Sequence, residues 1–255
     1  RDGVEAPRRN GAAAAPAELP PGFVGRHLTV DGKRAPRTRR YAEGLLPDLG
    51  LQADGPAYTV AGPISWSNQG ANAELVYSAG GGATWAEPRC AVQGIQWFGD
   101  QNRSVLKMMQ PCFTNLVRRG WNPRGNNGTC SAYGPKCLAY PSGIVANCTL
   151  PRFVENVKEH LEQGQFYHDV PTQRILYMPL AGQNMTRVRA VLAVEEQLVH
   201  LSGATGHTFE GIAFEHATWL RPGQGLGYVE AQAAACDLCP VDMPPHGCVS
   251  PDYAG

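Results

Sequence analysis

Two apolar runs and the polar stretch between them decide the fold class: residues 91–97 read AVQGIQW and residues 104–109 read SVLKMM. Similar short runs occur at residues 57–60 and 74–78, and clusters of Gly, Pro and Asn lie between the runs. Short β-type runs bounded by such turn-forming clusters are typical of strands joined by tight connections. The sequence therefore predicts a small antiparallel β domain.

A hairpin turn is expected upstream, at Asp31-Gly32, between the runs HLTV (27–30) and KR (33–34). Asp and Gly both tolerate the positive φ angles that a two-residue hairpin turn requires. The basic stretch from Lys33 to Arg40 is interpreted as a solvated strand edge, because charged edges discourage pairing between sheets of different molecules.

One helix is predicted, over residues 151–163. Pro is favoured in the first turn of a helix and Gly just past its end, which are the places of Pro151 and Gly164. The apolar residues that share one face of this helix are Phe153, Val157 and Leu161. The β-type runs that follow it occupy residues 174–178, 188–194 and 197–201.

The last third of the chain has a different pattern. In residues 207–219 (HTFEGIAFEHATW), Gly211 separates two short runs, and the second run alternates large apolar residues with small or charged ones. A similar run follows at residues 227–233 after a Gly-rich connection. Short strands with small residues at their corners are compatible with stacked coils of a parallel β-helix.

Composition excludes several classes of function. The 255 residues include 43% hydrophobic residues, which is enough for a folded core, and 22 basic side chains balance 22 acidic ones. This balance argues against nucleic acid as a partner. The apolar runs are far shorter than the roughly 18 to 20 residues that a membrane span needs, so no span is expected. The chain starts at Arg1 with neither an initiator Met nor a signal segment, and we interpret this as a processed or truncated start whose true N-terminus lies upstream or was removed.

Cysteines and glycosylation sequons both indicate secretion. Eight cysteines, an even number, fall in two parts of the chain: Cys90, Cys112, Cys130, Cys137, Cys148, Cys236, Cys239 and Cys248. In an oxidising compartment this pattern predicts disulfides. Four Asn-x-Ser/Thr sequons occur where about one is expected by chance: Asn102, Asn127, Asn147 and Asn184. We therefore expect a secreted, disulfide-bonded glycoprotein of eukaryotic origin, extracellular or at the cell surface.

A family resemblance rests on phrases in a fixed order: residues 30–37 (VDGKRAPR), 85–90 (WAEPRC), 108–112 (MMQPC), 154–156 (VEN), 166–169 (FYHD), 176–179 (LYMP), 209–214 (FEGIAF) and 217–219 (ATW). With them, the stretch from Leu28 to Ala235 resembles right-handed parallel β-helix repeat proteins of the pectin-lyase-like kind, many of them classed as glycoside hydrolases. The resemblance implies that the first coils precede this stretch. It also implies that most of the helix, with its acidic catalytic residues, follows it.

Three features depart from the family pattern: the loop between Cys130 and Cys148, the Cys-rich tail, and Gln165 at a position where the family often has Glu. They favour a eukaryotic relative and put its catalytic competence in doubt. A solenoid needs about three coils for stability, and two at most are visible. We therefore expect the open end to be covered by the rest of the polypeptide, by a partner or by the tail.

The expected fold class is mainly β: part of a right-handed parallel β-helix with an inserted antiparallel β subdomain and one short α-helix. The expected divisions are a linker or extended arm over residues 1–24, a β-rich inserted subdomain with a disulfide-linked loop over 25–149, a helix plus β segment over 150–206, the first β-helix coils over 207–235 and a Cys-rich tail over 236–255.

Two carboxylates are candidate catalytic residues, Glu215 and Glu230. Both are expected to point out of the coil, on neighbouring coils about 4.8 Å apart, and retaining glycosidases hold their carboxyl groups about 5 to 5.5 Å apart. The simpler interpretation is two ordinary surface glutamates. His207 and His216 bracket the same run and are candidate acid–base groups, or else half-buried structural histidines.

Three aromatic residues are candidates for stacking on sugar rings: Trp219, Tyr228 and Trp85. An aromatic face offers apolar contact and its polar edge a hydrogen bond, although packing in the core would use the same residues. The pair Cys236 and Cys239, with His246 and Cys248, has the residue types of a zinc site. In an oxidising compartment these thiols form disulfides instead, so no metal and no cofactor is expected.

The leading hypothesis is a module of an extracellular β-helix glycoprotein that contacts polysaccharide or glycan, is related to glycoside hydrolases and lacks a complete catalytic site of its own. One alternative is a structural or assembly component of a cell wall, extracellular matrix or surface filament, whose partners are other chains. The other alternative is an active glycoside hydrolase that uses Glu215 or Glu230.

Overall fold

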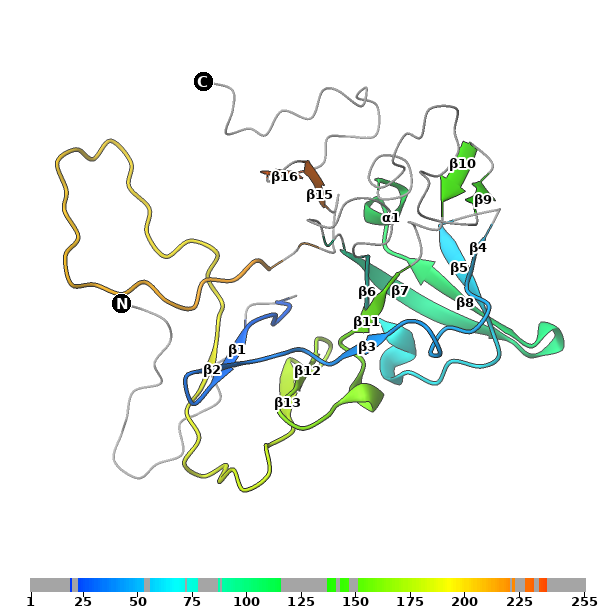
Figure 1. Cartoon of the computed structure of the whole chain (residues 1–255), viewed down its shortest axis with the longest axis horizontal. Coiled ribbons are helices and arrows are strands. Elements are labelled where there is room, and N and C mark those ends of the chain that lie inside the picture. The colour runs from blue at the N-terminus through cyan, green and yellow to red at the C-terminus, as the bar shows by residue number, and fades with distance from the viewer. Residues whose placement is uncertain are drawn as a thin grey trace. The chain divides into compact units, whose positions relative to one another are not determined.

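The structure is a computed structural model and describes residues 19, 23–52, 56–71, 73–77, 87, 89–115, 137–140, 143–146, 151–220, 222, 228–231 and 234–237 (Figure 1). The chain divides into two compact units. The first comprises Arg1–Arg37 and Leu161–Leu220, and the second comprises Thr38–His160 and Arg221–Gly255. Each unit is therefore built from segments that are far apart in the sequence. The domain divisions expected from the sequence stay a prediction.

The second unit is built on a seven-stranded sheet in which every pair of neighbours is antiparallel. The strands in spatial order are β3 (Arg39–Tyr41), β11 (Phe153–Glu155), β6 (Glu74–Val76), β7 (Arg89–Phe98), β8 (Arg103–Met108), β5 (Ala57–Ala61) and β4 (Gly50–Leu51). The runs quoted at residues 91–97 and 104–109 form the long hairpin of β7 and β8 (Figure 1). The predicted antiparallel β domain is confirmed.

Short elements complete the second unit. Two strand pairs, β9 (Cys137–Tyr140) with β10 (Gly143–Ala146) and β15 (Tyr228–Ala231) with β16 (Ala234–Asp237), are antiparallel hairpins. The helical elements among the described residues are single turns: η1 (Ser67–Gly70), η2 (Gly99–Gln101), α1 (Cys112–Asn115) and η5 (Lys158–His160).

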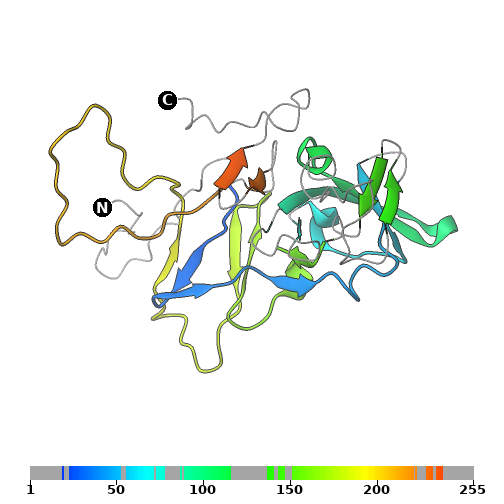
Figure 2. The same ribbon diagram turned by 45° about the horizontal axis from the view of Figure 1, so that its top comes forward.

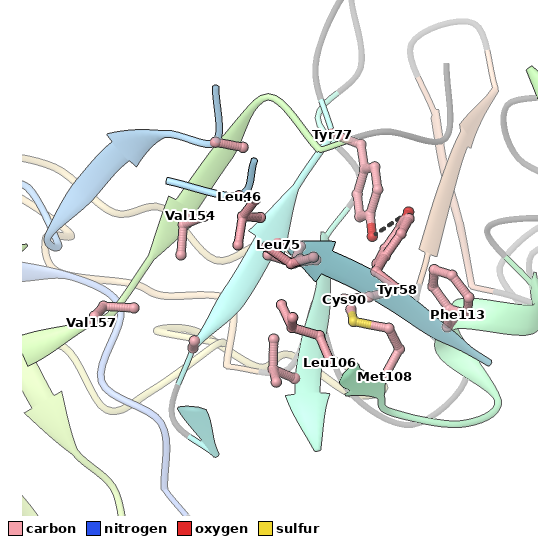
Figure 3. Close-up of a cluster of buried hydrophobic side chains, with 14 of the residues drawn as sticks. Leu46, Tyr58, Leu75, Tyr77, Cys90, Leu106, Met108, Phe113, Val154 and Val157 are labelled. Atoms are coloured by element: carbon pink, nitrogen blue, oxygen red, sulfur yellow. Dashed lines mark hydrogen bonds between the residues drawn. The ribbon is translucent and has the colours of Figure 1, made fainter. Parts of the chain in front are cut away.

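The core of the second unit lies on the sheet and includes side chains from five of its strands (Figure 3). Tyr58, Leu75 and Leu106 are fully buried. The ring of Tyr58 meets Phe113 edge to face at 5.2 Å, and its hydroxyl donates to the hydroxyl of Tyr77 over 3.3 Å. This bond satisfies two buried hydroxyls that would otherwise weaken an apolar core.

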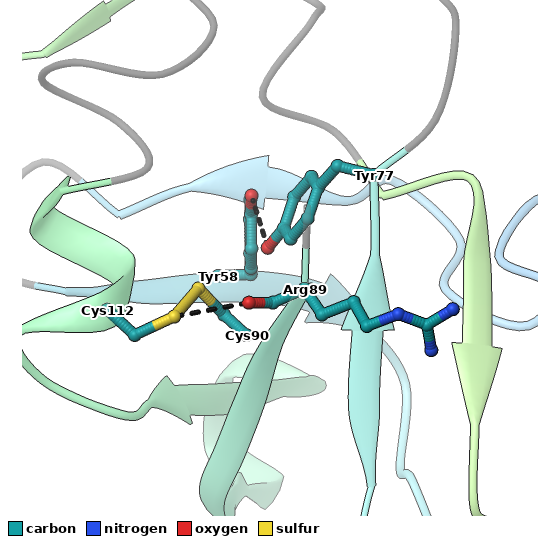
Figure 4. Close-up of a disulfide and its surroundings, with 5 residues drawn as sticks. All are labelled: Tyr58, Tyr77, Arg89, Cys90 and Cys112. Atoms are coloured by element: carbon teal, nitrogen blue, oxygen red, sulfur yellow. Dashed lines mark hydrogen bonds between the residues drawn. A yellow bond between two sulfur atoms is a disulfide. The ribbon is translucent and has the colours of Figure 1, made fainter. Parts of the chain in front are cut away.

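A disulfide joins Cys90 of β7 to Cys112 of α1 (Figure 4). The sulfur of Cys112 lies 3.2 Å from the carbonyl oxygen of Arg89, whose side chain extends away from the disulfide. This bond confirms that the chain forms a disulfide. Of the other cysteines, Cys137 lies in β9 and Cys236 in β16, and the remaining ones, Cys130, Cys148, Cys239 and Cys248, lie outside the described residues.

The first unit contains a three-stranded antiparallel sheet in the order β14 (Ala190–Leu192), β1 (Leu28–Val30) and β2 (Lys33–Ala35). The predicted hairpin turn is present, because Asp31 and Gly32 have φ angles of 50° and 75°. A second hairpin pairs β12 (Phe166–Asp169) with β13 (Arg174–Tyr177). The small core of this unit contains Leu28, Val30, Ala35 and Phe166.

The predicted helix over residues 151–163 is wrong. Its first half contains strand β11, which pairs with β3 on one side and β6 on the other, and only Lys158–His160 form a helical turn. Asn156 has a φ of 57° and ends the strand. Backbone pairing on both edges, together with the full burial of Val154, outweighs the local helical pattern. The one short α-helix of the described residues is α1 instead.

Among the described residues, the parallel β-helix expected from the sequence is not seen: all named strand pairs are antiparallel. Residues 197–201, expected to be a strand, and residues 207–220 form no strand, and most of their side chains are exposed. Ile212 and Phe214, expected to point into a coil, are about half exposed. Figure 2 shows this part of the chain, yellow to orange, as a long loop.

Candidate functional site

The candidate site lies on residues 193–220 of the first unit, here called the return segment. Its two ends run side by side: Glu195 and Ala217 form a parallel bridge, and the amide of Thr218 donates to the carbonyl of Glu195 over 2.9 Å. Parallel pairing requires a crossover connection of a dozen or more residues, and the two bridged residues are 22 positions apart. The return segment therefore makes one loop that comes back parallel to its own start.

Hydrogen bonds fix the end of the return segment. The amide of Leu220 donates to the carboxylate of Glu196 over 2.7 Å, and the carbonyl of Leu220 accepts from the guanidinium of Arg26 over 3.1 Å. Thr218 is buried. Trp219, between these anchored neighbours, keeps 39% of its surface exposed. The backbone around the indole is thus held in place while part of the ring faces solvent.

His216 has an unusual backbone conformation, with a φ of 68°. Such left-handed angles are uncommon for residues other than Gly. Backbone conformations that the surrounding structure keeps in such strained regions are often found at functional sites. The Nδ1 atom of His216 lies 3.5 Å from the hydroxyl of Thr29, and its Nε2 atom lies 3.8 Å from a carboxylate oxygen of Glu215. The Nδ1 atom of His27 lies 3.3 Å from the carbonyl of Ala217.

This geometry gives an imidazole between a hydroxyl and a carboxylate. The side chains of His216 and Glu215 are 31% and 70% exposed, so a solvent molecule or a ligand can reach both. The imidazole and the carboxylate together offer hydrogen-bond donors and acceptors to a ligand. Three of the residues singled out in the sequence, Glu215, His216 and Trp219, therefore lie on one anchored stretch of backbone. His207 is exposed and lies earlier in the same loop.

The other predicted site residues are placed differently. Glu230 and Tyr228 belong to β15, whose partner is the antiparallel strand β16. Glu215 belongs to the first unit and Glu230 to the second, so their pairing as catalytic carboxylates stays a prediction. Trp85 lies outside the described residues.

The sequons also divide between described and undescribed parts. Asn102 lies at the turn between β7 and β8, and Asn184 lies in the loop after β13; both are exposed. The side-chain oxygen of Asn184 accepts hydrogen bonds from the amide and hydroxyl of Thr186, over 3.1 and 2.8 Å. Asn127 and Asn147 lie outside the described residues.

Sequence reasoning missed a second group of charged residues, on the sheet of the second unit. Glu155 of β11 lies directly opposite Glu74 of β6 on one side and Arg39 of β3 on the other. One oxygen of Glu155 accepts from Arg39 Nε over 2.6 Å, and the other accepts from Arg89 Nη1 over 2.5 Å. Glu87 pairs with both arginines.

This charged cluster is a structural cross-link. Burial opposes the charges of Arg39 and Arg89, but the nearby glutamates outweigh it and raise the pKa of both guanidinium groups. Both oxygens of Glu155 are occupied by arginines, which leaves this carboxylate poorly suited to accept a proton from a substrate. No alternation of apolar and polar side chains in residues 153–155 (FVE) marked this cluster, and the predicted helix covered the same residues.

His168 of β12 is a buried structural histidine. Its Nδ1 atom accepts a hydrogen bond from the amide of Gly25 over 2.8 Å, which places the proton of the neutral ring on Nε2. Burial, assisted by the positive charge of Arg37, lowers the pKa of His168 to about 4. His168 is therefore neutral at pH 7 and joins the β12 strand to the chain that precedes β1.

The described residues hold no group of three or more His, Cys, Asp or Glu side chains that could bind a metal ion. Within the same part of the chain, no helix is long and apolar enough to cross a membrane.

Comparison with known proteins gives one likeness in structure. No family model matches the chain, and no curated protein matches its sequence. Among solved structures, the chain is similar to a protein titled "Glycoside hydrolase", with a TM-score of 0.52 and 18% sequence identity. The match covers 80% of this chain and 34% of that one, so the chain spans about a third of the length of the protein that it matches. At this identity the likeness is one of fold.

Proposed function

We propose that this chain is a carbohydrate-contacting module of a protein related to glycoside hydrolases, and that its return segment meets the sugar. The observation that carries the proposal is the likeness in fold to a glycoside hydrolase over 80% of the chain. A fold alone does not define an activity, so the chemistry of the site has to support the assignment.

The return segment carries the kinds of side chain that bind sugars: an aromatic ring for stacking and polar groups for hydrogen bonds. A partly exposed indole, Trp219, offers an apolar face to a pyranose ring, and the neighbouring imidazole and carboxylate of His216 and Glu215 offer hydrogen bonds to hydroxyl groups. The anchored backbone on both sides of Trp219 lowers the entropy that would be lost on binding.

The parallel β-helix is proposed for the larger protein. Two isolated bridges support it, Arg37 with Phe166 and Glu195 with Ala217, because both are parallel although every named strand pair is antiparallel. A separation of 22 residues between bridged positions lies in the range of solenoid repeats. In this proposal the return segment is the start of a coil, and further coils supply the catalytic carboxylates.

Secretion and N-glycosylation belong to the same proposal. The Cys90–Cys112 disulfide and the exposed positions of Asn102 and Asn184 support it. The proposed partners are a polysaccharide or glycan and, at the coil, the rest of the polypeptide or another chain of an extracellular assembly.

The assembly alternative has an observation of its own in its favour. The return segment exposes large apolar side chains that a monomer in water would be expected to cover: Leu198, Val199, Leu201, Phe209, Ile212 and Phe214. If assembly were the main role, sedimentation analysis would find a stable oligomer whose formation is lost on polar substitution of Phe209 and Ile212, with no binding to polysaccharides.

The experiment that tests the proposal measures sugar binding and sugar release on the same panel of plant and algal cell-wall polysaccharides. We expect the chain to bind at least one polysaccharide and the Glu215→Gln variant to release as little reducing sugar as the wild type. Release by the wild type that is lost in Glu215→Gln would assign catalysis to this residue. Absence of binding to every polysaccharide would refute the proposal.

A further inference from the structure

The tip of the β7–β8 hairpin exposes a large aromatic side chain next to a sequon. Trp97, near the end of β7, keeps 44% of its surface exposed. The loop that joins it to β8 consists of Gly99–Gln101 and Asn102, and the sequon is Asn102-Arg103-Ser104. Trp97 lies directly opposite Ser104, the third residue of that sequon, in the strand register.

The indole of Trp97 leans toward the loop. A side chain added at Gly99 would come within 3.3 Å of the Trp97 Nε1 atom, so the ring lies against the first residue of the loop. The amide of Asn102 donates to the carbonyl of the same Gly99 over 3.3 Å. The ring and the sequon asparagine therefore contact the same residue from different directions.

The loop holds Asn102 in a fixed and exposed position. Its φ and ψ are both 45°, a left-handed conformation that Asn adopts more readily than most residues. Its carbonyl accepts from the amide of Gly62 over 2.8 Å, which ties the loop to the end of β5. A group attached to the Asn102 side chain would thus start from a rigid base.

The second aromatic ring at the tip is already covered. The guanidinium of Arg103 lies 5.5 Å from the centre of the Phe98 ring, over its face. Trp97 is the ring at the hairpin tip that remains broadly exposed. Exposing an indole of this size to water is unfavourable, and an amphipathic partner that covered it would remove this cost.

We propose, resting on the proposed N-glycosylation, that Asn102 carries an N-linked glycan whose first N-acetylglucosamine packs on the indole of Trp97. The sugar ring has an apolar face of C–H groups that suits the indole face, and its hydroxyl groups stay in solvent. The covalent link makes this contact intramolecular, so even a weak interaction is formed for most of the time.

The burial of Ser104 in the folded hairpin fixes when the glycan is added relative to folding. The Ser104 hydroxyl donates to the carbonyl of Gly62 over 2.8 Å and accepts from the amide of Ile64 over 3.1 Å, and Ser104 is fully buried. A glycosylating enzyme cannot read this hydroxyl in the folded hairpin. The glycan is therefore added before β7 and β8 have paired, and the sugar then settles on Trp97 as the hairpin closes.

A thermodynamic cycle in protein secreted from a eukaryotic host tests the proposal. Four proteins are compared: the wild type, Asn102→Gln, Trp97→Ala and the double variant, with site occupancy measured by mass spectrometry of peptides. We expect loss of the Asn102 glycan to lower the melting temperature by about 2 to 4 °C more when Trp97 is present than when it is Ala. Asn184→Gln serves as the control, because its effect should not depend on Trp97.

A second measurement does not rely on the stability of the variants. Hydroxyl-radical oxidation of Trp97 should be slower by about threefold or more in the glycosylated wild type than in Asn102→Gln, since a packed sugar excludes solvent from the ring. An unoccupied Asn102 in the secreted protein would overturn the proposal. Equal oxidation of Trp97 with and without the glycan, or the same loss of stability in both backgrounds, would also overturn it.

Discussion

The substitution Glu155→Gln should destabilise the second unit strongly, although it changes a single atom of the side chain. Both oxygens of Glu155 accept guanidinium hydrogen bonds, over 2.6 Å from Arg39 and 2.5 Å from Arg89, and the side chain is 5% exposed. The amide of Gln carries no charge and turns two N–H donors toward the arginines.

The size of the loss in stability depends on the ion pairs that Arg39 and Arg89 keep in the variant. Removing one partner of a buried ion pair costs about 3 to 5 kcal/mol, because the other charge is left uncompensated. Arg39 is about a third exposed and both arginines keep Glu87, so compensation is partial. We therefore expect a value at the lower end, about 3 kcal/mol, in the free energy of unfolding.

Urea unfolding is the suitable assay, because guanidinium chloride would screen the charges under study. The midpoint should fall while the slope of the transition stays the same, and hydrogen exchange should quicken in the peptides that cover β11 and β7. Glu43→Gln, at an exposed position, is the matched control and should cost less than about 0.5 kcal/mol. A loss below about 1 kcal/mol for Glu155→Gln would refute the view that this charged cluster cross-links the sheet.

Two further predictions concern the disulfide and the buried histidine. The Cys90→Ser/Cys112→Ser variant should lose about 3 kcal/mol in urea unfolding, because the disulfide closes a loop of 22 residues in the unfolded chain, and an unchanged midpoint would show that the cross-link contributes little. For His168, the folded pKa of about 4 lies below the unfolded value near 6.5, so the unfolded state binds more protons between these values. The contribution to stability is fully present above about pH 6.5 and is lost as the pH falls toward 4. Urea unfolding across this range should show a loss of about 2 kcal/mol in the free energy of unfolding, and this loss should be smaller in His168→Gln. The same dependence of stability on pH in both proteins would contradict the assignment.

Local signals in the sequence predicted much of the sheet. The runs at residues 57–60, 91–97 and 104–109 became β5, β7 and β8, and the turn at Asp31-Gly32 formed as expected. In these stretches turn chemistry and apolar runs agree with the tertiary structure. The wrong helix prediction at residues 151–163 has a physical cause. A Pro near the start and a Gly at the end of a segment are local signals, whereas β11 depends on strands more than 70 positions away in the sequence.

The candidate site was predictable in part. Glu215, His216 and Trp219 were found from residue type and proximity in the sequence. The residues that anchor them, Arg26 and Glu196, could not be found, because their partners are backbone groups of Leu220 brought close by folding. The charged cluster was missed for a related reason: apart from Glu87, which precedes β7, its members come from β3, β6, β7 and β11, and strand order in a sheet is not encoded locally.

The binding of a polysaccharide by Trp219 tests the central claim most directly. Isothermal titration of the wild type, Trp219→Phe and Trp219→Ala against the best-binding polysaccharide of the panel should show an affinity within about threefold for Phe and a loss of about tenfold for Ala, as expected for a stacked ring. Leu201→Ala, an exposed apolar residue of the same return segment, should bind like the wild type. Equal affinity for the wild type and Trp219→Ala would contradict the account, because the return segment would then not be where the sugar binds.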